Sequence, residues 1–341
     1  MGKLSKVIAT LSLLLSGCTA AARESAPSQL PEMLADTGLY ADRTTQEIAA
    51  DNRPFSPQYP LWTDGAKKRR WIHLPPGASI DASSGDWQFP VGTKLWKEFS
   101  FGRVVETRYM ERTASGWRFA TYVHEEGGAA KLALASGGVV PVEVAPGLRH
   151  RIPSETDCRV CHGTGASGAP SPVLGFSALQ LSDDRDPNAA HREPAPPRAL
   201  HLAALLDDGR LRGYGGPRAP RIEGRTETER AALGYLHGNC GGCHRSGGAA
   251  ESVGMSLSSG GSDRGPIVTA VGKPSHVTPE QMRIAAGRPD ASVVLGRMTS
   301  RVPAEQMPPL GTQLVDDEGS RLVARWIAEL SNTTDRQGDH R

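Results

Sequence analysis

The sequence has few aromatic residues and almost no excess charge. Phe, Trp and Tyr make up 5% of its 341 residues, and 39 basic side chains are set against 37 acidic ones. Two of the basic residues, Lys3 and Lys6, lie in an N-terminal segment that we expect to be removed. Nucleic-acid binding rests on an accumulated excess of Lys and Arg. No nucleic-acid partner is therefore expected.

Long hydrophobic runs and the common signatures of catalysis are also missing. The apolar run at residues 7–15 is much shorter than the roughly 20 residues needed to cross a bilayer, which excludes a polytopic membrane protein. We recognise no catalytic triad, phosphate-binding loop or nucleotide fingerprint. Glycine and proline are abundant instead, with 39 and 26 residues, a share well above average. Much of the chain is therefore expected to be loop.

The N-terminus has the pattern of an export signal. Lys3 and Lys6 precede the apolar run, and Ser16 and Gly17 stand directly before Cys18. A basic start, a short apolar stretch and a small-residue exit predict that residues 1–17 are a cleaved signal peptide. The alternative is an ordinary signal peptide cut at residues 20–22, for which the thiol has no role.

Residues 15–18, Leu-Ser-Gly-Cys, resemble the lipobox of bacterial lipoproteins. The resemblance implies that Cys18 is acylated and becomes the first residue of the mature chain. Several acyl chains would anchor it firmly to a membrane, since each buried methylene contributes roughly 0.8 kcal/mol. Thr19 replaces the Asp that holds enteric lipoproteins at the inner membrane. We therefore expect attachment at the periplasmic face of the outer membrane, or at the cell surface.

The other four cysteines form two C-x-x-C pairs, and a histidine follows each pair directly. In an exported protein this pattern is the attachment signature of a c-type haem. The two thiols add to the porphyrin vinyl groups, and the adjacent imidazole becomes the proximal iron ligand. The sequence thus predicts two covalently attached haem c groups, the first on Cys158, Cys161 and His162 and the second on Cys240, Cys243 and His244.

Three other uses of such cysteines fit less well. A zinc ribbon separates its pairs by about 15–20 residues, whereas 78 residues lie between Cys161 and Cys240. Thioredoxin-like redox sites need a βαβ setting, and the sequence indicates none around either pair. Structural disulfides across so short a loop would be strained.

A small cytochrome c domain can be assembled around the second motif. A capping box at Thr226 and Glu229 predicts a helix before it. A second helix is predicted from Asp316 and Asp317, with apolar residues at helical spacing up to Leu330. Two helices flanking the motif are the elements that clamp a porphyrin in such domains.

The segment between these helices contains the expected distal ligand of the second haem. Met307 precedes two prolines, which exclude regular helix and favour a stiff loop that can hold a thioether over the iron. Met307 is therefore predicted to ligate the iron opposite His244. Met298 is the rival, but residues 292–298 read as a helix with a core methionine.

The sixth ligand of the first haem stays open. No Met-Pro-Pro segment follows His162, and the next 38 residues are rich in Gly, Pro, Ser and Ala. An open coordination position is a further alternative. The candidate side chains are His150, His201, Met255 and Met282.

Five of the six tryptophans lie in an N-terminal region that reads as short strands. An antiparallel sandwich or small barrel is predicted, with the tryptophans in its core rather than in a sugar site. The basic residues 67–70 are predicted to be solvated at the start of a strand. The expected strands are 70–74, 93–101, 105–112, 117–123, 131–134 and 139–144.

Several segments resemble a family of bacterial dihaem c-type cytochromes. They include residues 59–67 (YPLWTDGAK), 89–93 (FPVGT), 235–240 (YLHGNC) and 307–311 (MPPLG). The likeness spans roughly residues 30–330 and implies two covalent haems, an exported location and electron transfer. His124 departs from the family, which has an aromatic residue there.

The expected fold class is α+β and multidomain, with a β-rich antiparallel N-terminal domain followed by a mainly α-helical cytochrome c domain. The expected function is a dihaem cytochrome lipoprotein that carries electrons between a redox partner protein and another carrier. The alternative is a dihaem peroxidase or oxidase whose first haem is five-coordinate. The predicted segments are a signal peptide (1–17), a lipid-anchored tether (18–55), the β-rich domain (56–150), the first haem segment and linker (151–221), the cytochrome c domain (222–331) and a disordered tail (332–341).

Overall fold

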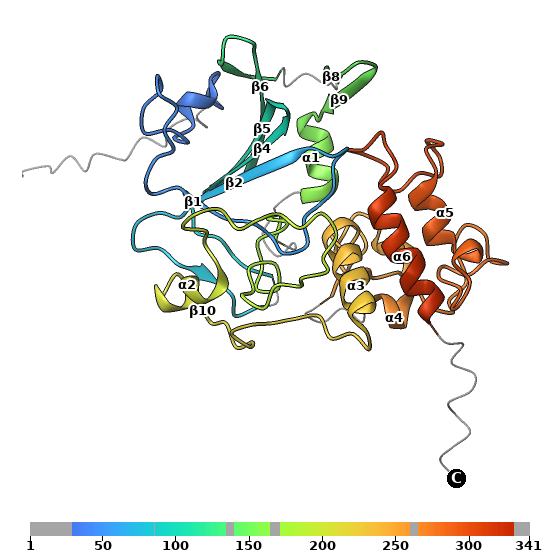
Figure 1. Cartoon of the computed structure of the whole chain (residues 1–341). Coiled ribbons are helices and arrows are strands. Elements are labelled where there is room, and N and C mark those ends of the chain that lie inside the picture. The colour runs from blue at the N-terminus through green and yellow to red at the C-terminus, as the bar shows by residue number, and fades with distance from the viewer. Residues whose placement is uncertain (1–28, 85, 134–139, 164–170, 260–264, 331–341) are drawn as a thin grey trace, which may run out of the picture. The chain divides into compact units, whose positions relative to one another are not determined.

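The computed structural model describes residues 29–84, 86–133, 140–163, 171–259 and 265–330 (Figure 1). Within these ranges, the residues from Pro31 onward belong to one compact unit. The predicted signal peptide, Cys18 and the predicted tail lie outside the described residues. The domain borders predicted within the compact unit stay predictions.

A six-stranded antiparallel sheet forms the β-rich part of the chain (Figure 1). Its strand order is β1-β2-β4-β5-β6-β7. The antiparallel β-rich region is thus confirmed, but in the described part of the chain it is one open sheet and neither a sandwich nor a barrel. The strands are β1 (Arg53–Pro54), β2 (Lys67–His73), β4 (Lys94–Phe101), β5 (Arg103–Thr113), β6 (Gly116–His124) and β7 (Ala130–Leu132).

Smaller elements surround the sheet. Strands β8 (Val140–Ala145) and β9 (Leu148–Ile152) form an antiparallel hairpin, and β3 (Ile80–Asp81) pairs in parallel with β10 (Leu211–Arg212). Short helices complete this half of the chain: the 3₁₀ turn Leu34–Asp36, α1 (Glu155–His162) and α2 (Leu202–Asp207).

Segments outside the sheet cover both of its faces. These segments bury the apolar side chains that a second sheet would bury in a sandwich. On one face the indole of Trp96 donates to the Thr37 hydroxyl at 2.9 Å, beside the buried Leu34. On the other face, Phe119 and Leu95 pack in one cluster with apolar residues from the 173–211 segment. The predicted core role of the tryptophans is confirmed for the four that are buried, Trp71, Trp87, Trp96 and Trp117.

The basic residues 67–70 alternate between these two faces. Lys67 and Arg69 are exposed, whereas Lys68 is half-buried and Arg70 is only 6% exposed. The expectation that all four are solvated was therefore wrong for Arg70, because successive side chains of a strand point to opposite faces.

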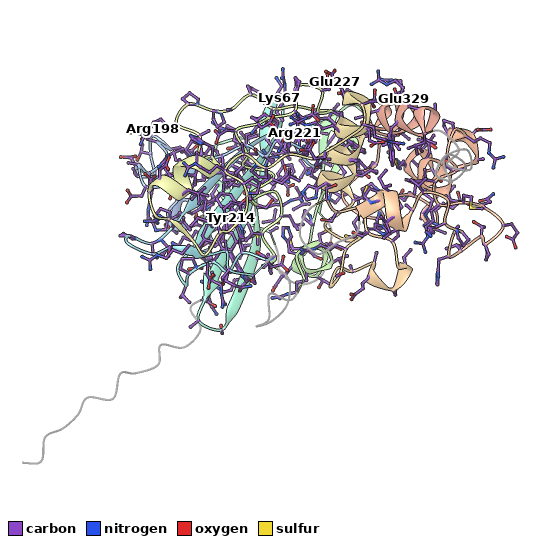
Figure 2. All side chains as sticks on the ribbon, turned by 90° about the horizontal axis from the view of Figure 1, so that it is seen from below. Lys67, Arg198, Tyr214, Arg221, Glu227 and Glu329 are labelled. Atoms are coloured by element: carbon purple, nitrogen blue, oxygen red, sulfur yellow. The ribbon has the colours of Figure 1, made fainter. Side chains whose placement is uncertain are left out.

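The helical part contains α3 (Glu227–Asn239), α4 (Gly265–Thr269), α5 (Val293–Thr299) and α6 (Asp317–Glu329), with 3₁₀ turns at Glu251–Val253 and Pro289–Ala291. Helices α3, α5 and α6 share one buried cluster that includes Trp326 and Met298. The start of α3 meets the end of α6, where the Thr226 hydroxyl donates to Glu329 at 3.0 Å; Figure 2 labels the neighbouring Glu227 and Glu329.

The predicted helix starts at Thr226 and Asp316 are confirmed. Each side chain accepts the amide of the third helical residue, Glu229 at 3.1 Å and Gly319 at 2.9 Å. Such N-caps each contribute about 1 kcal/mol. The Glu229 carboxylate does not return to Thr226 as the capping box predicts, but accepts from the amide and guanidinium of Arg225.

Candidate functional site

The second motif lies at the C-terminal end of α3, with Cys240 as the C-cap of the helix. A tight turn follows, in which the amides of Cys243 and His244 both donate to the Cys240 carbonyl, at 3.1 and 2.9 Å. Cys240 also packs against the buried cluster of the helical part. The two thiols and the imidazole are therefore carried on one small turn with firm support.

A cavity of about 210 Å³ opens beside this turn. The predicted distal loop, residues 307–309, is in its lining together with both thiols and the histidine of the motif. Most other lining residues are apolar, which suits a flat hydrophobic cofactor. They include Val253, Met255, Leu257, Val277, Val293, Val294 and Met298.

The surroundings of His244 at this cavity favour a neutral imidazole. Its side chain is buried, and its Nδ1 has no hydrogen-bond partner among the described residues. Burial lowers the pKa of His244, and the nearby guanidinium groups of Arg297 and Arg283 lower it further. A neutral imidazole keeps one nitrogen lone pair available for a metal.

Arg283 and Arg297 bring unbalanced positive charge to the cavity wall. Both line the cavity, and neither has a carboxylate within ion-pair distance in the described ranges. Among the described residues, the Arg283 guanidinium donates only to backbone carbonyls, including those of Gly254 at 2.7 Å and Val253 at 2.7 Å. The cavity is thus apolar with cationic groups in its wall. Two thiols, an imidazole, a thioether and two guanidinium groups are side chains that could hold a haem c with two propionates.

The two rival methionines both reach the cavity, but in different settings. Met298, on α5, is 7% exposed and belongs to the buried helical cluster, as its predicted core role requires. Met307 is half-buried, and its amide donates to the Arg297 carbonyl at 2.9 Å. The loop of Met307 is therefore fixed to α5 at the cavity, while the choice of Met307 as ligand stays a prediction.

The first motif lies on helix α1. A complete capping box begins this helix, with Ser154 and Asp157 exchanging side-chain to backbone hydrogen bonds. Cys158 packs against the buried cluster below the sheet, where burial raises the pKa of its thiol to about 11. The sequence around the motif therefore builds a helix that rests on the sheet.

His162 is oriented by a single strong hydrogen bond. Its Nδ1 lies 2.6 Å from the Pro172 carbonyl, and because a carbonyl only accepts, Nδ1 carries the proton. Burial lowers the pKa of His162 to about 4, so the ring is neutral near pH 7. The Nε2 lone pair is then free to bind a metal, and a backbone acceptor on the other nitrogen is the usual way to fix a ligand histidine.

The structure brings the two motifs together. The thiols of Cys161 and Cys243 lie close enough for each to shift the pKa of the other, although their motifs are far apart in the sequence. This contact lowers the pKa of Cys161 and raises that of Cys243. All four motif cysteines are free thiols. The second cysteine of each motif therefore faces the other motif.

The four side chains proposed as sixth ligand of the first haem are in unlike places. His150 is buried and lies 2.9 Å from the Glu106 carboxylate, and His201 lies 3.0 Å from Asp183. Met255 lines the cavity of the second motif, and Met282 is 38% exposed. None is singled out. Near the second motif, His237 accepts from the Ser259 amide at 3.1 Å.

Several residues near the motifs were not predicted from the sequence. Lys97 lies close enough to the first motif to lower the pKa values of Cys161 and His162. The alternation of strand residues could have indicated that Lys97 faces inward. For Arg283 and Arg297 the sequence carries no local signal, because Arg283 lies in a loop and the cavity beside Arg297 on α5 depends on how distant segments pack.

The described residues contain no group of three or more His, Cys, Asp or Glu side chains placed to hold a metal ion. In the same ranges, no helix has the length and apolar character needed to cross a membrane. Comparison with models of protein families, with curated proteins and with solved structures finds no match to the chain.

Proposed function

We propose that the chain is a dihaem c-type cytochrome lipoprotein that carries electrons in a bacterial envelope between a redox partner protein and another carrier. The observation that carries the proposal is the cavity beside the second motif, where Cys240, Cys243, His244 and Met307 share one lining. A haem c held there would supply one-electron transfer between ferric and ferrous iron.

Each residue at the second motif has a chemical role in this proposal. The thiols of Cys240 and Cys243 would hold the haem covalently, each adding across a vinyl double bond with the thiol hydrogen going to the other vinyl carbon. This addition consumes no oxidant. His244 and Met307 would be the iron ligands, and a thioether ligand such as Met307 would raise the reduction potential. Arg283 and Arg297 are candidates to pair with the propionates.

At the first motif, Cys158 and Cys161 supply the attachment thiols and His162 the proximal ligand. The hydrogen bond from His162 Nδ1 to the Pro172 carbonyl supports this role, because it leaves Nε2 without a proton. The contact between Cys161 and Cys243 also supports a carrier with two centres, since the attachment points of both cofactors would be neighbours.

A spectroscopic redox titration of the purified holoprotein tests the proposal. We expect a mass increase of two haems that survives denaturation, two low-spin irons and no reaction of the ferrous protein with carbon monoxide. His162→Ala and His244→Ala should each perturb one of the two irons. A chain isolated from a host with a working haem-attachment system, yet carrying no covalent haem, would end the proposal.

A dihaem peroxidase or oxidase is the second candidate function. It is favoured by the settings of the four proposed sixth ligands: His150 and His201 are engaged with carboxylates, Met255 lines the cavity of the second motif, and Met282 is 38% exposed. This function predicts a high-spin first iron and peroxide turnover that His162→Ala abolishes.

The lipid anchor on Cys18 is tested separately. Cys18→Ala should release the protein from the membrane fraction and abolish labelling by a radioactive fatty acid, while both haems remain attached. Retention in the membrane fraction with no labelled lipid would argue against the anchor.

A further inference from the structure

One face of the sheet concentrates four basic side chains beside the first motif. Lys68 and Arg70 alternate on β2, and the pairing of the strands places Arg70 opposite Lys97 and Lys97 opposite Arg108. All four point to the same face, because directly paired residues share a face and alternate residues of a strand do too.

This face is directed at the first motif. Phe119 belongs to the same face, two residues before the partner of Arg108, and its ring lies 5.6 Å from the His162 ring. Arg108 and Lys97 both act on the pKa of Cys161 and of His162. The basic face therefore borders the place where a haem bound by His162 would lie.

Two of the four basic groups are balanced by acids. Arg70 forms an ion pair with Glu193 at 2.5 Å, and Arg108 forms one with Glu106 at 2.6 Å. Glu106 is fully buried and also binds His150 at 2.9 Å. Arg70 binds both oxygens of Glu193, whereas Arg108 and His150 share Oε1 of Glu106, whose Oε2 has no hydrogen-bond partner in the described ranges. Each carboxylate is thus already paired with an arginine.

Lys68 and Lys97 are left with no carboxylate within ion-pair distance in the described ranges. The Lys97 ammonium lies 4.9 Å from the centroid of the Phe99 ring, which offers only a weak cation–π contact. Two carboxylates, Glu193 and Asp316, raise the pKa of Lys68 by their negative charge. Asp316 already accepts hydrogen bonds from His191 and Tyr235.

The electrostatic cost of this arrangement is reflected in the pKa values of the two lysines. Burial first, and then the neighbouring cations, lower the pKa of Lys68 to about 8 and the pKa of Lys97 well below its usual value. Unpaired charge in a poorly hydrated place is costly. An anionic group with two charges, held between α1 and the sheet, would remove this cost.

We propose that Lys68 and Lys97 bind the two propionate carboxylates of the haem attached to the first motif. The proposal rests on the proposed function, since it requires a haem on Cys158 and Cys161. Two propionates match two unpaired ammonium groups, and the covalent bonds of the motif hold the porphyrin next to this face. Lys97 is thus a positioning and charge-balancing residue, distinct from the sixth ligand.

Charge-neutral variants of the holoprotein test the pairing. In Lys68→Gln and Lys97→Gln, loss of a positive charge stabilises the ferric state, so one of the two midpoint potentials should fall. The propionate bending bands in the resonance Raman spectrum should shift in the same variants. Lys97→Arg keeps the charge and should restore both signals.

The matched control is Lys67→Gln, which removes a lysine from the same strand but from its exposed, opposite side (labelled in Figure 2). This variant should change neither potential. The potential that responds to Lys97→Gln must also differ from the one that responds to Met307→Ala.

The outcomes distinguish a failure of the lysine pairing from a failure of the proposed function. A wild-type protein with two covalent haems but no response to Lys68→Gln and Lys97→Gln beyond the Lys67→Gln control overturns the pairing alone. A change from low spin to high spin in Lys97→Gln also overturns it, because the amine would then be an iron ligand. A wild-type protein with no covalent haem overturns both the pairing and the proposed function.

Discussion

The carboxylate of Asp64 accepts a hydrogen bond from the backbone amide of Leu314 at 2.9 Å. The preceding amide, that of Gln313, donates to the same carboxylate at 2.9 Å. Asp64 is only 7% exposed and belongs to the loop before β2, whereas the two amides follow the Met-Pro-Pro segment. Asp64 therefore fastens the loop that carries the proposed distal ligand.

Asp64→Gly should loosen this loop. The glycine fits the left-handed backbone at this position, where φ is +46°, so the variant removes the acceptor without adding backbone strain. We expect a loss of about 1–2 kcal/mol in the free energy of unfolding. In the holoprotein, the band of the thioether–iron bond should disappear at a lower temperature than in the wild type.

Asp64→Asn serves as the control for charge. It tolerates the same backbone conformation and keeps one acceptor oxygen, so its effect should be smaller than that of Asp64→Gly. Equal thermal loss of the thioether band in wild type and both variants would show that Asp64 does not hold the Met307 loop.

Met307→Ala and Met298→Ala should have opposite signatures. Removal of Met307 takes away the proposed ligand, so the thioether–iron band should vanish and one midpoint potential should fall. Removal of Met298 deletes a core side chain and should cost about 2–5 kcal/mol of stability while the band remains. Spectra and denaturant unfolding measure the two effects, and a band lost only in Met298→Ala would reassign the ligand.

Local patterns predicted helices α3, α5 and α6 well, whereas α1 was not predicted. The caps at Thr226 and Asp316 and the apolar spacing before Leu330 are properties of neighbouring residues, and α3 and α6 begin where these signals lie. The buried Met298 on α5 follows from the same helical spacing. Strand positions were also predicted to within a few residues, because alternation is local.

Relationships between distant strands and loops could not be predicted in this way. The meeting of Cys161 with Cys243 depends on how two separate segments pack, and no spacing rule contains it. The inward direction of Lys68 depends on strand register, which a one-residue slip would reverse. The sandwich was expected because the sequence does not reveal that loops and α1 cover the sheet.

The segments that carry the family resemblance lie against each other in the structure. Asn239 directly precedes the first cysteine of the second motif, and its side chain accepts a hydrogen bond from the Trp62 amide at 2.7 Å. A Cβ atom on Gly238 would lie 2.3 Å from the Tyr59 carbonyl oxygen. These two recognisable motifs are thus the two sides of one close contact.

Gly238→Ala should separate these segments. The added methyl group meets backbone, which can move only if the Tyr59 segment shifts, so we expect a loss of about 1–3 kcal/mol in the free energy of unfolding. The matched control is Gly296→Ala on α5, where a Cβ meets nothing within 4 Å. That variant should be neutral or gain up to about 1 kcal/mol from helix propensity.

Urea unfolding of both glycine variants measures the difference. Equal stability of Gly238→Ala and the wild type would mean that the Tyr59 segment is free to move away from α3.

The Asp316 carboxylate joins three parts of the helical core and should make stability depend on acid pH. It caps α6 and accepts from the Tyr235 hydroxyl at 2.9 Å and from His191 Nε2 at 2.8 Å. Burial alone would raise the pKa of Asp316, but the hydrogen bonds from His191, Gly319 and Tyr235 outweigh it and lower the pKa below its usual value.

The sign of the effect follows from this direction. A carboxyl with a lower pKa in the folded state stabilises the fold fully above its unfolded pKa, about 3.9 for Asp, and this contribution is lost as the pH falls through the folded pKa.

Asp316→Asn cannot titrate and should cost about 1–2 kcal/mol at neutral pH, because a charged acceptor is replaced by a neutral one. The difference between wild type and Asp316→Asn should therefore shrink below about pH 4, whereas Asp317→Asn, at the exposed next residue, should track the wild type. Denaturant unfolding at a series of pH values measures the difference, and a constant gap between wild type and Asp316→Asn down to about pH 3 would contradict a role for the Asp316 charge.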